Sequence, residues 1–501
     1  MPNDQKPLSH AQRERAILDY WEAHQIFQKS VDSRPADRQY TFYDGPPFAT
    51  GLPHYGHIVG SVMKDVIPRF WTMRGYRVER VWGWDCHGLP IENIIEKEFD
   101  LKNKKDIENY GVGAFNARCE SKVLEYAKEW QRVIRRLGRW VDMDNAYKTM
   151  DLPFMESIWW VFKTLYNKNR IYEGAKSMHL CPRCETTLSN FEVTLAYADV
   201  TDISVTIAVE LTSGPYQGAK MLAWTTTPWT LPGNVLLAVG ADISYSLVES
   251  AGQRYILATS CLERNFAGKE YTILESLAGS SLVGASYDPI FPCFKTHANA
   301  FRVVSADFVE DTEGTGVVHI APGFGADDLA LGQAEGVAPI MHVKTSGLLV
   351  DEVQSFFKDQ GHDVADVPVK AKDKNSEIDI VVIKVLAHRG QLFAKNKLTH
   401  SYPLCWRCDT PLINYATSSW FVKVAEEVNT LVKNNEKIHW VPNSMQHGRF
   451  GKWLEGARDW AISRSRYWGT PLPVWKSEKG DVLVVGSVEE LEAYVGHKIM
   501  N

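Results

Sequence analysis

The residues best suited to chemistry near the start of the chain are His54 and His57, within the glycine- and proline-rich segment DGPPFATGLPHYGHIVG, residues 44–60. An aromatic, β-prone run precedes this segment, and apolar residues at helical spacing follow from Tyr55. The pattern predicts a strand, a loop and a helix beginning near Gly56, whose first turn would offer free N–H groups to an anion. Glycine at that point lets a nucleotide approach the backbone, and two imidazoles could donate to phosphate oxygens. The alternative is a surface loop with two ordinary histidines.

Two C-x-x-C pairs form a second candidate site: Cys181 with Cys184, and Cys405 with Cys408. Four thiolates suit a tetrahedral Zn²⁺ ion, and four protein ligands leave no open position, so the role would be structural. The pairs are far apart in sequence and meet only if the block between them is a self-contained insertion with adjacent ends. Four structural cysteines or two separate redox pairs are the alternatives.

The block between the cysteine pairs differs from the rest of the chain in its sequence pattern. Its short β-rich runs lie at residues 203–211, 220–224, 235–239, 244–248, 255–258, 316–320 and 339–343. The flanking sequence alternates helical and strand patterns, with helical periodicity at residues 9–30, 114–140 and 153–172 and a strand at 76–81. We therefore predict a parallel, Rossmann-like α/β domain interrupted by an inserted β-rich domain.

Composition narrows the classes of function. The chain has 501 residues, of which 45% are hydrophobic, and a formal net charge of −6. This excludes a generally basic nucleic-acid coat, so contact with RNA would need local patches. The N-terminus lacks the apolar core of a signal peptide, and the apolar runs are too short for membrane spans. Together with the metal-type cysteine pairs, these features predict a soluble, cytoplasmic protein with no membrane partner.

The histidine-bearing segment resembles the His-Ile-Gly-His signature of class I aminoacyl-tRNA synthetases, with Tyr55 in place of the isoleucine. The flanking sequence GPPFATGLPHYGH, residues 45–57, is similar to that of isoleucyl enzymes, whereas valyl enzymes typically have Pro-Pro-Pro-Asn and leucyl enzymes Pro-Tyr-Pro-Ser here. A valyl or leucyl synthetase is the nearest alternative. The resemblance implies five parts: residues 1–165, first half of the catalytic domain; 166–196 and 391–420, zinc module and stem; 197–390, editing domain; and 421–501, start of the second catalytic half.

The resemblance also implies a site that activates isoleucine with ATP. Activation aligns the amino-acid carboxylate with the α-phosphate, which requires positioning and charge stabilisation. By resemblance, His54, His57 and Gly56 would contact ATP. Asp85, in WGWDCHGLP at residues 82–90, would hold the substrate ammonium, although alone it would be interpreted as a helix cap. Pro46 and Trp468 would wall the aliphatic pocket; Trp468 lies in WAISRSRYWG, where Ser465 replaces the glutamine usual in this group.

A pocket that accepts isoleucine excludes valine by only ~1–3 kcal/mol, a limit for which this enzyme family is the standard example. A second, hydrolytic pocket is therefore expected. The segments TTTPWTLPGN, residues 225–234, and GTGVVHIAPGFGADD, residues 314–328, resemble the editing segments of isoleucyl enzymes. Hydroxyls would position water and ribose, His319 would line the pocket, and Asp328, rather than Asp327, would anchor the ammonium. The predicted editing residues are Thr225, Thr226, Thr227, Thr230, Asn234, His319 and Asp328; an ordinary strand and turn is the alternative.

The resemblance implies ATP with Mg²⁺, isoleucine and tRNA-Ile as substrates, one structural Zn²⁺, and a monomeric parent enzyme that hydrolyses Val-tRNA-Ile. The family's Lys-Met-Ser-Lys-Ser loop and later Rossmann strands are not found in these residues. We therefore expect an N-terminal fragment that cannot charge tRNA alone. A non-catalytic module that binds tRNA or zinc is the alternative from another class.

Overall fold

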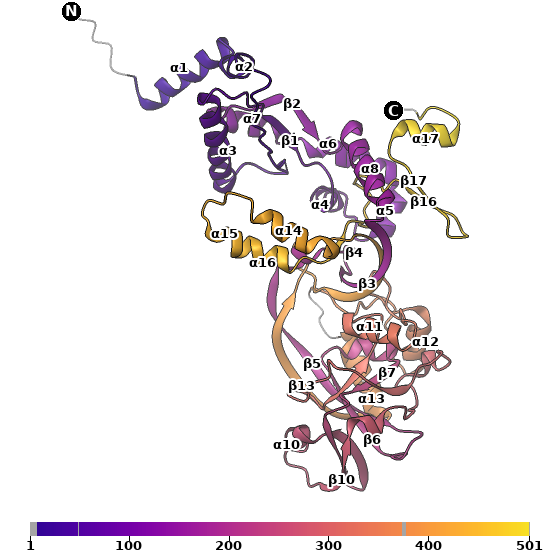
Figure 1. Ribbon diagram of the computed structural model, residues 1–501. Helices are drawn as coiled ribbons and strands as arrows, with labels where there is room; N and C mark the ends of the chain where they lie inside the picture. The colour runs from indigo at the N-terminus through magenta and orange to yellow at the C-terminus, as the bar shows by residue number, and fades with distance from the viewer. Residues whose placement is uncertain (1–7, 49, 373–376, 500–501) are drawn as a thin grey trace, which may run out of the picture. The chain divides into compact units, whose positions relative to one another are not determined.

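The computed structural model describes residues 8–48, 50–372 and 377–499. It divides into two compact units: unit 1 comprises Met1–Arg170 and Arg466–Asn501, and unit 2 comprises Ile171–Ser465. Figure 1 shows the elements of both. The return to unit 1 at residue 466 lies later than the predicted boundary at 421, because strands paired with the insertion stem extend past that point. The finer five-part division stays a prediction.

Unit 1 is an α/β unit built on parallel strand pairing. Its elements are α1 (His10–Ala23), α2 (Ile26–Asp32), α3 (Tyr55–Met73), β1 (Val81–Trp84), α4 (Leu89–Glu98), α5 (Lys104–Tyr110), α6 (Val112–Val123), α7 (Ala127–Arg136), β2 (Asp142–Lys148), α8 (Leu152–Asn167), β16 (Val474–Lys476), β17 (Val482–Val484) and α17 (Val488–Val495). β1 pairs in parallel with β2, and the isolated parallel bridges 39–77 and 48–85 add the segment that leads to the histidine loop. The expected strand before that loop forms only these bridges.

The local predictions for unit 1 need four corrections. The helix predicted over 114–140 is two helices, α6 and α7, and the helix predicted over 153–172 ends at Asn167. The predicted helix over residues 9–30 is two helices, because Gln25 has a left-handed backbone (φ 49°) that ends the first one. The strand predicted at 76–81 begins only at Val81. The core beneath the strands is aromatic: Trp82, Trp84 and Trp130 are buried and pack at ring-centroid distances of 5.4–6.2 Å. These rings fix α7 against β1.

Unit 2 is dominated by β-structure. Its elements are β3 (Ile171–Cys181), β4 (Thr186–Thr187), α9 (Asn190–Val193), β5 (Tyr197–Glu210), β6 (Lys220–Thr225), the 3₁₀ helix η1 (Pro228–Gly233), β7 (Leu236–Val239), β8 (Ser244–Ser250), β9 (Gln253–Ala258), α10 (Leu262–Asn265), β10 (Thr272–Ala278), β11 (Arg302–Ser305), β12 (Val317–Ile320), α11 (Ala326–Ala334), α12 (Asp351–Asp359), α13 (Glu377–His388), β13 (Leu392–Pro403), β14 (Ile413–Val422), α14 (Val428–Asn435), α15 (Ser444–His447), α16 (Arg449–Glu455) and β15 (Trp460–Ala461).

A nine-stranded sheet forms the centre of unit 2. Its order is β10-β8-β9-β6-β12-β7-β11, with β5 beside β6 and β13 beside β5. Six of the seven predicted β-rich runs are strands of this sheet. The prediction for residues 339–343 is wrong: only Val343 makes an isolated bridge, to Leu349. Pro339 begins that run without an N–H to give to a strand ladder, which explains the loss.

Two antiparallel pairs bring the ends of the insertion together. β3 pairs with β14 from Ile171–Val422 to Leu180–Ile413. β5 pairs with β13 from Tyr197–Pro403 to Ile207–Leu392, and Figure 1 shows these two long strands side by side. The insertion is therefore closed at its base by paired strands.

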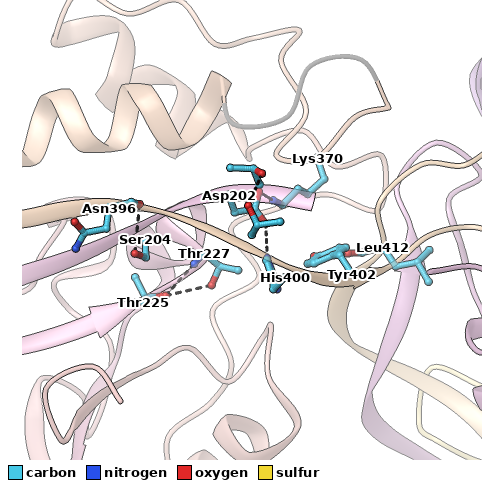
Figure 2. A network of polar contacts seen from close by, with 11 residues as sticks. Asp202, Ser204, Thr225, Thr227, Lys370, Asn396, His400, Tyr402 and Leu412 are labelled. Carbon is cyan, nitrogen blue, oxygen red and sulfur yellow. Dashed lines mark hydrogen bonds and ion pairs between the residues drawn. The ribbon is translucent and has the colours of Figure 1, made fainter. Parts of the chain in front are cut away.

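A buried ionic cluster joins this stem to the loop that follows α12. Lys370 Nζ lies 2.6 Å from Asp202 Oδ1, and both side chains are almost fully buried, at 0% and 1% exposure. His400 Nε2 lies 3.1 Å from the other carboxylate oxygen. Figure 2 shows Asp202 on β5 facing His400 on β13, with Tyr402 beyond it donating to the Leu412 carbonyl at 2.7 Å. Both carboxylate oxygens of Asp202 are thus occupied.

The change Lys370→Met should lower the free energy of unfolding of unit 2 by ~3–5 kcal/mol, because it leaves Asp202 buried with only a half-exposed histidine as partner. Urea unfolding measures this loss. The matched control is Lys344→Met, which breaks an exposed 2.7 Å pair with Asp351 and should cost ~0–1 kcal/mol. Equal, small losses in both variants would contradict the buried pairing.

Candidate active sites and metal centre

The histidine loop ends in a helix N-terminus, as the sequence predicts. His54 is the N-cap of α3, and its N–H donates to His57 Nδ1 at 3.2 Å. The two rings stack with centroids 3.6 Å apart. Burial lowers the pKa of His57, with smaller contributions from His54 and Lys64, so the ring is neutral at pH 7. Because Nδ1 accepts a hydrogen bond, the proton of His57 lies on Nε2 and is free to be donated.

Packing from α7 and α3 fixes this loop. Trp130 donates its indole N–H to the Gly51 carbonyl at 2.8 Å, and its ring lies 4.6 Å from that of His57. At the start of the loop, Asp44 pairs with Lys64 and Arg139. A Cβ on Gly56 would lie 3.1 Å from His54 Cε1, so a larger residue there would press on the His54 ring.

The amino-acid end of the predicted site assembles around Asp85. The Asp85 N–H donates to the Pro47 carbonyl at 3.0 Å, which ties it to the residue after Pro46. Trp468 donates its indole N–H to the Cys86 carbonyl at 2.6 Å, next to Asp85. Burial raises the pKa of Asp85 to about 6, opposed by hydrogen bonds from the His87 and Cys86 backbone and from Thr149. The structure thus brings Pro46, Asp85 and Trp468 to one place within unit 1.

Sequence reasoning missed the residue that holds this arrangement, Glu92. Its Oε1 accepts from the N–H groups of Tyr467 at 2.9 Å and Trp468 at 2.7 Å, and its Oε2 lies 3.6 Å from Arg466. Glu92 is 2% exposed. Its only signal in the sequence is an acid placed among the apolar residues at the start of α4, an unusual buried position for glutamate.

In unit 2 the threonines cluster where β6 enters η1. Thr225 Oγ1 accepts from the Thr227 N–H at 3.1 Å and lies 3.3 Å from Thr227 Oγ1, which lies 3.3 Å from Thr230 Oγ1. Thr226 and Thr227 are half-buried, whereas Thr225 and Thr230 are buried. A chain of hydroxyls that runs from half-buried to buried positions can order a water and a sugar hydroxyl.

His319 on β12 joins that cluster. Thr230 donates to the Thr227 carbonyl at 2.8 Å, so its oxygen accepts from His319 Nε2 at 2.9 Å. Asn234 Nδ2 lies 3.5 Å from the opposite ring nitrogen, and Asn234 Oδ1 accepts from Tyr287 at 2.7 Å. Burial lowers the pKa of His319 to about 4, so it is a neutral donor.

Asp328 lies in the first turn of α11 and reaches back to the end of β12. Its Oδ2 accepts from the Ala321 N–H at 2.7 Å, and burial raises its pKa to about 6. A Cβ on Gly325 would lie 2.7 Å from Asp328 Cγ, so this turn requires a glycine. Asp327 is exposed. The ring contact between Trp229 and Phe324, 5.3 Å, joins the threonine loop to this turn.

The four predicted cysteine ligands form one cluster. All four Sγ atoms lie within 4.8 Å of one another, with Cys181–Cys408 at 3.5 Å and Cys184–Cys408 at 3.7 Å. A tetrahedral Zn²⁺ with bonds of ~2.3 Å needs sulfur–sulfur distances of about 3.8 Å, so the thiolates fit this ion. Leu188, Val193 and Leu412 pack around them as a dry shell. Separate redox pairs do not describe this geometry.

Among the residues that the structure describes, none of the helices is both long and apolar enough to cross a bilayer.

Comparison with known proteins gives the family of the chain. The family model described as tRNA synthetases class I (I, L, M and V) matches residues 16–499. The isoleucine–tRNA ligase of Treponema denticola is 47% identical over 99% of this chain and 47% of that protein. The ligase of Chlamydia caviae is 48% identical over 98% of this chain and 46% of that protein.

This chain thus spans about half the length of the curated relatives that it matches. A solved ternary complex of Agrobacterium radiobacter K84 agnB2 LeuRS with tRNA and LeuAMS covers 96% of this chain and 52% of that chain, at 16% identity and a TM-score of 0.37. At that score the likeness adds nothing to the assignment. Because the family model matches almost the whole sequence, this chain belongs to the class I tRNA synthetases of the isoleucine, leucine, methionine and valine group.

Proposed function

We propose that this chain activates isoleucine and proofreads Val-tRNA-Ile as part of an isoleucine–tRNA ligase. The observation that carries the proposal is the identity of 47% to such a ligase over 99% of the chain. Isoleucine, ATP with Mg²⁺ and tRNA-Ile would be the substrates. The metal-type cysteine pairs support a reducing, cytoplasmic setting.

In the activation site, the geometry supports a separate role for each residue. His57 Nε2 and the N-terminus of α3 would donate to ATP phosphate oxygens as charge develops. Asp85 would pair with the substrate ammonium, which favours the ionised carboxylate against the effect of burial. Trp468, held by Glu92, would supply an apolar wall. These residues position reactants and carry no proton in the step.

In the editing site, the threonine cluster and His319 would hold a water and the terminal ribose, while Asp328 would pair with the free ammonium of the valyl ester. The water would attack the ester carbonyl, the ribose oxygen would leave, and valine and tRNA would be released. His319 is a neutral donor within this cluster, and its ring would restrict the pocket to the smaller side chain.

For the cysteine cluster we propose one structural Zn²⁺ held by Cys181, Cys184, Cys405 and Cys408. The ion would supply no chemistry to either reaction, because four thiolates fill its coordination shell. Its role would be to join the two ends of the insertion stem.

Asp85→Asn should raise the KM for isoleucine about 10- to 100-fold, because it removes the charge that pairs with the ammonium. The KM for ATP should stay unchanged. ATP–pyrophosphate exchange by the full-length protein measures both constants. The control is Asp142→Asn, whose carboxylate accepts from the N–H groups of Asp144 and Asn145 within β2. An unchanged isoleucine KM in Asp85→Asn would refute the assignment.

Asp328→Asn should lower kcat/KM for Val-tRNA-Ile hydrolysis about 10- to 100-fold, whereas Asp327→Asn at the exposed neighbour should not. In the wild type, kcat/KM should fall as the pH drops below about 6, because protonation removes the Asp328 charge. Deacylation rates between pH 5 and 8 test this. A wild-type profile identical to that of Asp328→Asn would remove Asp328 from the reaction.

The purified chain should contain one zinc ion by elemental analysis. Cys408→Ser should lower both the zinc content and the unfolding temperature, since metal binding contributes to folding. Cys293→Ser, at a half-buried cysteine outside the cluster, should keep its zinc. A zinc content of zero in protein prepared without chelators would contradict the assignment.

A further inference from the structure

One backbone unit of the threonine loop is held from both sides by buried side chains. The Trp229 N–H donates to Asp379 Oδ1 at 2.9 Å. The Trp229 carbonyl lies 2.9 Å from His342 Nε2. Trp229 stands between Thr227 and Thr230 in η1, whereas Asp379 comes from α13 and His342 from the loop after α11. Two distant segments therefore fix the two peptide groups that flank Trp229, the second of which leads into Thr230.

Both side chains are held where water does not reach. Asp379 and His342 are each 0% exposed, and within the described residues Asp379 Oδ2 and His342 Nδ1 have no hydrogen-bond partner. Burial lowers the pKa of His342 to about 4, so the ring is neutral and its single proton lies on Nε2, directed at the Trp229 carbonyl. Burying polar atoms without partners opposes folding, which makes these residues poor choices for mere filling.

The surroundings are shaped to this arrangement. A Cβ on Gly233, at the end of η1, would lie 2.3 Å from His342 Nδ1, so only glycine leaves room for the ring. The His342 ring also lies 4.6 Å from that of Phe324, which in turn contacts Trp229. The same contacts therefore reach the turn that carries Asp328.

The charge of Asp379 is coupled to the buried cluster of the stem. Burial raises its pKa to about 7, Lys370 acts in the opposite direction, and Asp202 adds to the rise. Figure 2 shows Lys370 and Asp202 in the same region as Thr225 and Thr227. One buried ammonium, that of Lys370, thus acts on two carboxylates: it pairs with Asp202 on β5 and lowers the pKa of Asp379 on α13.

We propose that Asp379 and His342 are positioning residues of the hydrolytic site, which hold the Trp229 peptide so that Thr227 and Thr230 keep the spacing needed to order the attacking water. The inference rests on the proposed editing function. It assigns neither residue a contact with the substrate. Its consequence is that the rate of hydrolysis depends on one acceptor on α13 and one donor at position 342.

The test uses Val-tRNA-Ile deacylation by the full-length protein under single- and multiple-turnover conditions. Asp379→Leu and His342→Leu fill a similar volume but remove the acceptor and the donor. Each should lower kcat about 10- to 100-fold with KM within about twofold, because misplaced groups slow the step without weakening tRNA binding. Asp379→Asn and His342→Gln keep an oxygen acceptor and an N–H donor, and each should restore most of the rate.

Val385→Ala is the control, since Val385 is buried on the same helix and makes no bond to Trp229. It should unfold at a lower urea concentration with an unchanged kcat. Equal kcat losses in Val385→Ala and Asp379→Leu, or failure of both conservative variants to restore the rate, would overturn the inference alone. Absence of hydrolysis by the wild type would overturn the proposed editing function, and the inference with it.

Discussion

The antiparallel pairing of β3 with β14 and of β5 with β13 is the constraint on which unit 2 depends. It closes a loop of more than two hundred residues, whose closure entropy must be offset by the ladders themselves. The register also decides which side chains meet. A slip of one residue would turn Asp202 away from His400 and would separate Cys181 from Cys408. The cysteine cluster and the buried ions therefore both depend on the registers of these two ladders.

The two candidate sites are positioned in different ways. In unit 1 the amino-acid end depends on a single buried carboxylate, since Glu92 binds consecutive N–H groups of a segment almost four hundred residues away in sequence. In unit 2 the groups lie on or beside neighbouring strands of one sheet. The threonines lie at the end of β6 and in the η1 segment that follows, and His319 lies on β12. Sheet geometry holds the second set, whereas the first set needs a specific polar contact.

This difference explains what could be predicted from the sequence. The helix at Tyr55, the strands of the insertion and the convergence of four cysteines follow from short-range patterns or from strong ligand chemistry. Glu92, His342 and Asp379 are lone polar residues in apolar surroundings, and no spacing rule distinguishes them from ordinary helix or loop residues. Their roles arise from contacts over long sequence distances. The helix break at Gln25 was not predicted for another reason: one residue with a left-handed backbone does not interrupt the pattern of apolar residues.

Asp85 and Asp328 lie in different units but have similar surroundings. Each is a half-buried carboxylate supported by backbone N–H groups, and in each burial raises the pKa to about 6. Burial disfavours the empty, ionised carboxylate, so an arriving ammonium gains more from pairing there than at an exposed acid. Both proposed substrates present such an ammonium, free isoleucine at one site and the valyl ester at the other. A site that recognises this group needs only one acid placed at the edge of the core, and the side-chain pocket is left to discriminate between isoleucine and valine.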